Sequence, residues 1–129
     1  MKFTALHIPP HDNPKPVQLD DSLAALQKAV GGYIEFVHII TFDGIRYVML
    51  VNEEGKLIGL EPNRRLGDED VLVGDCYICA IDEEGNHIDM PVQMLNAFTT
   101  LYYYPDNDIT DEEVANSMRI DVRPWGNDM

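Results

Sequence analysis

The stretch that decides the fold is YIEFVHIITFDGIRYVMLV, residues 33–51. It contains two apolar runs, 33–40 and 45–51, which are rich in the β-branched and aromatic residues that favour strands. Asp43 and Gly44 lie between them, and such a dipeptide suits the tight turn of a β-hairpin. Because both runs are apolar on both faces, the pattern predicts two central strands that are covered on two sides.

A helix is predicted before this hairpin. The side-chain oxygens of Asp20, Asp21 and Ser22 can cap its first amides, and Gly31-Gly32 marks its end. Its predicted apolar stripe consists of Leu19, Leu23, Leu26 and Val30. Residues 11–16 contain two prolines, so we expect a loop between this helix and a first strand at residues 3–8.

Turn, strand and helix patterns are also present from residue 51 onward. Residues 51–60 and 81–90 share a pattern of strand end, Asn or Asp, two glutamates and Gly, which predicts two similar hairpin turns with a left-handed Gly. Residues 71–81 form a predicted strand. A helix is expected over about 90–101, starting near Asp89 and Pro91 with a stripe of Val92, Leu95, Phe98 and Leu101. A capping box of Thr110 and Glu113 predicts a second helix over 111–118, and residues 119–129 are expected to form a strand or an ordered tail.

Together these elements predict one α+β domain over residues 1–129. We expect a mainly antiparallel sheet of about five to six strands with two to three helices packed on it. Apolar residues make up 45% of the 129, which is close to the globular average and enough for a core. The sequence shows no signal-peptide pattern and no run of the ~20 apolar residues that a membrane helix needs, so a cytoplasmic protein is expected.

Charge is distributed unevenly along the chain. Fifteen of the 23 acidic residues but only two of the nine basic residues follow Arg65, so the second half carries −13 of the net charge of −14. Such a field repels nucleic acid and anionic membranes and attracts basic protein surfaces. The acidic residues expected to form an interaction surface are Asp68, Glu69, Asp70, Glu83, Glu84, Asp106, Asp108, Asp111, Glu112 and Glu113.

No pattern in the sequence indicates a catalytic centre, a cofactor or a metal. Cys76 and Cys79 have the spacing of redox and zinc motifs, but they lie in a predicted strand, where residues three apart face opposite sides. They are expected to be two buried structural thiols. His7 and His11 cannot share a helix because two prolines separate them, and His38 is expected to be a hydrogen-bonded core residue. Residues 106–112 are rich in side-chain oxygens but lack the central Gly and the final Glu of a calcium loop.

The one basic pair in the chain lies in Pro62-Asn63-Arg64-Arg65. Adjacent guanidinium groups can hold an anion by forked hydrogen bonds. A ligand site is therefore conceivable in which Asn63, Arg64 and Arg65 hold phosphates and Tyr33 or Tyr47 stacks on a base. In the alternative, Asn63 caps a turn and the two arginines pair with Asp68, Glu69 or Asp70.

Two segments, LQKAVGGYIE at 26–35 and NEEGKLIGLEPNR at 52–64, resemble a domain family of unknown function. The resemblance spans residues 22–85, leaving 86–129 as an acidic C-terminal extension, and Glu61 stands where a second proline is expected. The family is widespread in bacteriophages, plasmids and other mobile elements, mainly of Gram-positive bacteria. The resemblance implies an accessory protein in the cytoplasm of a bacterial host, and it implies no activity, cofactor or catalytic residue.

Three functions stay open at this point. The first is a non-catalytic protein that binds a host or phage protein with a basic surface, as an inhibitor of host defence that imitates a phosphate backbone. The second is a protein that sequesters a nucleotide signal by binding it through the loop at 63–65, which we call a sponge. The third is an enzyme with an unrecognised site. Direct binding to nucleic acid or membrane is not expected, and a homodimer is left open.

Overall fold

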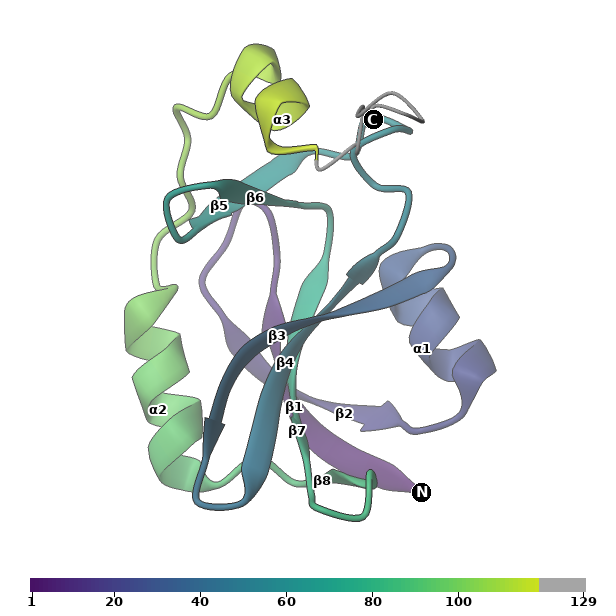
Figure 1. The fold of residues 1–129 in the computed structure, drawn as a ribbon. Coiled ribbons are helices and arrows are strands. Elements are labelled where there is room, and N and C mark those ends of the chain that lie inside the picture. Colours follow the sequence, from purple (N-terminus) through teal and green to yellow (C-terminus); the bar gives the residue numbers. More distant parts are fainter. Residues whose placement is uncertain (119–129) are drawn as a thin grey trace, which may run out of the picture.

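A six-stranded antiparallel sheet runs through the protein in the order β2-β1-β7-β4-β3, with β8 paired to β7. The computed structural model describes residues 1–118. The sheet contains β1 (Lys2–Ile8), β2 (Lys15–Asp20), β3 (Ile34–Phe42), β4 (Ile45–Asn52), β7 (Cys76–Ile81) and β8 (His87–Ile88). A second sheet pairs β5 (Pro62–Leu66) with β6 (Asp70–Val73), and the helices are α1 (Leu23–Val30), α2 (Val92–Leu101) and α3 (Asp111–Ser117). The predicted α+β class is confirmed (Figure 1).

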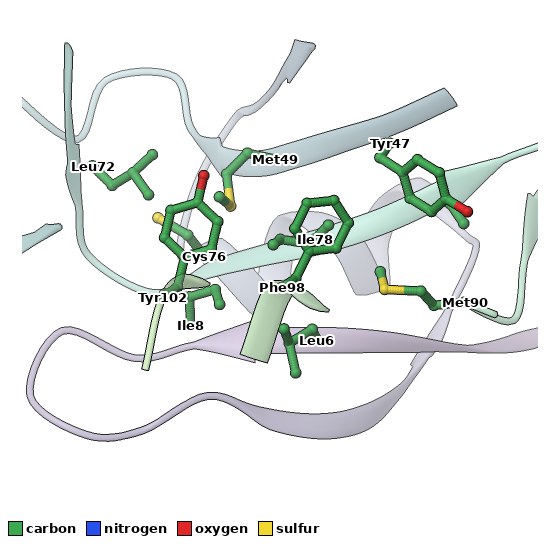
Figure 2. Packing of buried hydrophobic residues seen from close by; sticks show 11 residues of the cluster. Leu6, Ile8, Tyr47, Met49, Leu72, Cys76, Ile78, Met90, Phe98 and Tyr102 are labelled. Atoms are coloured by element: carbon green, nitrogen blue, oxygen red, sulfur yellow. The ribbon is translucent and has the colours of Figure 1, made fainter. Parts of the chain in front are cut away.

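The central strand is β7, whose six residues are all buried. Its alternate side chains enter two separate cores, because neighbours along a strand point to opposite faces. Ile78 packs with Phe98 of α2 and with Tyr102, which follows that helix, whereas Cys79 packs with Leu26 and Val30 of α1. The two helices therefore cover opposite faces of the sheet (Figure 1), and Figure 2 shows the core on the α2 face.

The predicted hairpin of β3 and β4 forms around Asp43 and Gly44. Asp43 and Gly44 have φ of 56° and 76°, the positive values that the tight turn requires. The prediction that both strands are central is wrong for β3, which lies at the edge of the sheet with Phe36, Ile40 and Phe42 exposed. A bulge between His38 and Ile40 interrupts its pairing with β4. His38 is exposed and bonds to Thr41, so it is not a core residue.

The predicted caps of α1 are confirmed. The Ser22 hydroxyl accepts a hydrogen bond from the Ala25 amide, and Gly31 ends the helix in the left-handed conformation with φ of 79°. The predicted stripe is only half right: Leu26 and Val30 are buried, but Leu23 is exposed. Leu19 belongs to β2, a strand that the sequence pattern did not predict. This strand begins at Lys15, inside the loop predicted from the two prolines.

The predicted strand over 71–81 is two strands in different sheets. Gly74 separates β6 from β7 with φ of 70°, which turns the chain from one sheet into the other. Of the two similar turns, only the second forms a hairpin: Gly85 has φ of 88°, and β8 pairs with β7. The first leads from β4 through turns to β5, which pairs with β6, and Gly55 does not take a positive φ.

Both C-terminal helices lie where the sequence predicts them. Pro91 precedes the first residue of α2, but Val92 and Leu101 are exposed and only Phe98 of the predicted stripe is fully buried. The Thr110 hydroxyl caps α3 by accepting a hydrogen bond from the Glu113 amide, which confirms half of the capping box. The expectation for residues 119–129 lies outside the described residues.

His87 makes stability depend on pH. Its ring stacks on Phe3 with centroids 4.6 Å apart, burial lowers its pKa, and within residues 1–118 its Nδ1 has no hydrogen-bond partner. As the pH falls, the His87 ring of the unfolded chain is therefore protonated at a higher pH than that of the folded chain. The free energy of unfolding consequently falls as the pH drops below about 6.5. Urea unfolding at pH 7.5 and 5.5 should show a smaller loss for His87→Phe than for the unmodified chain. The exposed His38→Gln is the control, and equal losses in all three would contradict this role.

Gly74 is required for shape as well as for φ. A Cβ there would lie 2.7 Å from Leu60 Cδ1, whereas Gly67, with φ of 67°, has nothing within 4 Å of its Cβ position. Gly74→Ala should therefore lower the free energy of unfolding by more than Gly67→Ala, by about 1–3 kcal/mol. Denaturant unfolding of the two variants measures the steric part alone, because both bear the same φ cost. Equal effects would show that Leu60 moves aside freely.

Candidate functional site

A bulge in β5 turns two consecutive polar side chains into the protein. Pro62 pairs with Val73 and Arg65 with Val71, so Asn63 and Arg64 together face the single residue Leu72. An extra residue of this kind re-aims side chains that would otherwise alternate between the two faces. Both Asn63 and Arg64 are fully buried, with exposures of 0% and 1%.

All five guanidinium N–H donors of Arg64 are matched by acceptors within the chain. Nε donates to the carbonyl of Tyr102 at 2.6 Å, and the two terminal nitrogens donate to the carbonyls of Pro9 and Asp12, both at 2.7 Å. The remaining two bonds go to Asn63 Oδ1 at 2.6 Å and the Tyr103 carbonyl at 3.3 Å. Burial lowers the pKa of Arg64, and Asp106 acts in the opposite direction.

Asn63 completes this arrangement on the other side. Its Nδ2 donates to the carbonyls of Ile8 and Gly74, each at 2.8 Å, so it joins the end of β1 to the connection between β6 and β7. Asn63 and Arg64 therefore have a structural role, and the Arg64 donors that the expected anion would need are occupied by acceptors of the chain itself. The two expected aromatic partners do not join them: Tyr33 is exposed, and Tyr47 is buried against Phe98.

Arg65 points the other way and binds carboxylates. It holds Glu113 by two hydrogen bonds of 2.6 and 2.8 Å and Asp108 by one of 3.0 Å, while Asp106 lies 3.9 Å away. These hydrogen bonds raise the pKa of Arg65 and lower that of Glu113. The predicted pairing with Asp68, Glu69 or Asp70 is wrong, and the real partners come from residues 41 to 48 positions later.

Arg65 brings α3 against the turn between β5 and β6, and a groove of about 360 Å³ forms between them. Its lining is acidic and includes Asp68, Glu69, Asp70 and Glu113 around Arg65, the one cation of this lining among residues 1–118. We call this the acidic groove. Two members of the expected acidic surface, Glu83 and Glu84, lie instead in the β7–β8 turn at the other end of the sheet from α3 (Figure 1). The fold thus divides the predicted surface in two.

Next to the acidic groove is an apolar hollow of about 390 Å³. Its apolar walls are Val37, Val51, Leu57, Val71, Leu72 and Val73, and the rest of the lining is Glu35, Asn52, Glu53, Lys56, Asp70, Ser117 and Met118. The two depressions share Asp70, Val71, Ser117 and Met118, so they are continuous. At the junction, Lys56 Nζ binds Asp70 Oδ1 at 2.6 Å and the Ser117 carbonyl at 3.3 Å.

Sequence reasoning missed the hollow. Its walls come from three separate strands, β3, β4 and β6, and from a turn, and apolar strand residues ordinarily indicate core. One local signal was available, because Lys56-Leu57-Ile58 places two large apolar side chains in a turn, and both are exposed.

The cysteines have no reactive character. Cys76 and Cys79 are unpaired and buried on opposite faces of β7, as predicted, and burial raises the pKa of each thiol to about 12. Within residues 1–118, no three His, Cys, Asp or Glu side chains are placed to hold a metal. His7 and His11 pair instead with Asp75 and Glu61. None of the helices in the described part of the chain has the length and apolar content needed to cross a bilayer.

These features define a small α+β domain with an internal arginine and an acidic groove joined to an apolar hollow. Residues 1–103 match the family model described as Domain of unknown function (DUF3846), and the chain belongs to this family. The match is wider than the predicted 22–85 and ends before α3, so Arg65 lies inside it and Asp108 and Glu113 lie outside. No curated protein and no solved structure matches the chain.

Arg64→Lys should destabilise the protein strongly. Lysine offers three donors to the acceptors that now receive five, and it leaves buried carbonyls without partners. We expect a loss of at least about 3 kcal/mol in the free energy of unfolding, measured by denaturant titration. Arg46→Lys on the exposed face of β4 is the matched control and should change stability by less than about 0.5 kcal/mol. Similar values for the two would contradict the structural role of Arg64.

Proposed function

We propose that the protein acts by binding, without a catalytic step, and that its acidic groove receives a basic surface of another protein. The observation that carries this proposal is the gathering of carboxylates around Arg65 in the described part of the chain. The β5–β6 turn supplies Asp68 and Glu69, and α3 with the loop before it supplies Asp108 and Glu113. Arg65 neutralises only part of this charge, so a cationic partner finds carboxylates that are already held in place.

The position of the groove supports a role in recognition. Asp68, Glu69 and Asp108 are exposed, and a groove open to solvent lets a partner approach without prior unfolding. Charged groups of this kind raise association rates and set specificity, and their effect is screened by salt over about 10 Å at 0.1 M. Binding should therefore weaken as salt is added.

The resemblance to phage and mobile-element proteins extends this proposal to a biological setting. A partner with a basic surface in a bacterial host includes the nucleic-acid enzymes of host defence. Fixed carboxylates in the groove would occupy the surface that such a partner uses for phosphates. The sponge hypothesis loses its main support, because the Arg64 donors are taken by the protein's own carbonyls.

Two double variants test the proposal with equal changes in charge. Asp68→Asn/Glu69→Gln removes two acids from the groove, and Glu83→Gln/Glu84→Gln removes two from the distant turn. With a nona-arginine peptide as probe, calorimetry at 50 mM salt should show about fivefold weaker binding for the first pair. The second pair should change binding less than twofold, and 300 mM salt should reduce the difference between them.

An equal loss in both variants would show that the peptide senses only the total charge of the protein, and would contradict a binding role for the groove. Because all four side chains lie in exposed turns, the variants should fold alike, and their unfolding curves provide the control.

A further inference from the structure

The apolar hollow gives the acidic groove a second kind of contact. Val71 and Leu72 are almost completely buried at its base, and Leu57 stands at its wall with 69% of its surface exposed. A volume of about 390 Å³ lies within the range of sites that take small ligands or single large side chains. Exposed apolar surface next to charged groups is typical of interaction sites.

The charges around the hollow indicate what can enter it. Lys56 is held by Asp70 and the Ser117 carbonyl, so two of its three N–H donors and its charge are already paired within the protein. Among residues 1–118, Glu35 and Glu53 at the rim have no ion-pair partner. An anionic ligand would be repelled by this rim, and a neutral apolar one would leave the carboxylates unused. A cationic segment with an apolar side chain can fill the hollow with that side chain and pair its positive charges with the two carboxylates.

We propose that the protein recognises a peptide segment of its partner in which a large apolar side chain is flanked by arginine or lysine residues. The apolar side chain enters the hollow, and the basic residues reach the acidic groove on one side and Glu35 and Glu53 on the other. The shared lining of Asp70, Val71, Ser117 and Met118 makes this a single surface. This inference rests on the proposed function and adds to it the chemistry of the partner.

The test compares two peptides, GRRLRRG and GRRARRG, which differ only in a central leucine or alanine. Calorimetry with the 129-residue chain should show about tenfold tighter binding of the leucine peptide, since burying the larger side chain favours association. Leu57→Ser should reduce this ratio. Ile58→Ser is the matched control, because Ile58 is similarly exposed at 59% but does not line the hollow. Asp68→Asn/Glu69→Gln should weaken both peptides and preserve their ratio.

The outcomes separate this inference from the proposed function. Equal affinity for the two peptides would overturn the apolar anchor and leave the acidic groove in place, whereas no binding of either peptide would overturn both. A third outcome concerns the chain's own C-terminal residues, which follow Met118 and include Ile120, Val122 and Trp125. If Trp125→Ala, which leaves the charge unchanged, raises the affinity for the leucine peptide, the hollow is occupied by the chain itself and the assignment to a separate partner is wrong.

Discussion

One buried guanidinium holds together the parts of the structure from which the site is built. Arg64 receives its acceptors from the connection after β1, from its neighbour Asn63 and from the residues that end α2. A buried charge is tolerable only when its hydrogen-bonding capacity is met, so all the segments that carry the acceptors must be in place in the folded protein. The second sheet is thereby attached by hydrogen bonds to the segments that follow β1 and α2.

The bulge in β5 lets adjacent residues do opposite tasks. Arg64 points inward to carbonyls, while Arg65 points outward to Glu113 and Asp108. The inward residue fixes the strand, and the outward residue then fixes α3 and its carboxylates relative to that strand. Electrostatic recognition depends on such pre-positioned groups, because charges held in place need less reordering when a partner arrives. The acidic groove is in this sense a result of the internal network.

Local patterns predicted much of the fold and little of the site. The Asp43-Gly44 turn, the caps at Ser22 and Thr110 and the opposite facing of the two cysteines depend on neighbours within a few residues, and the structure confirms them. The break at Gly74 and the edge position of β3 depend on which strands pair over long distances. Arg64 was the hardest case: four of its five acceptors are backbone carbonyls, and every residue type has one, so no side-chain pattern could reveal them.

The two thiols on β7 have a practical consequence. Cys76 belongs to the core on the α2 face and Cys79 to the core on the α1 face, so the two sulfurs are buried on opposite sides of the sheet. A thiol reagent can reach either one only when its own side of the sheet opens. The native protein therefore contains two reporters, and their separate labelling rates would reveal which face of the sheet opens first.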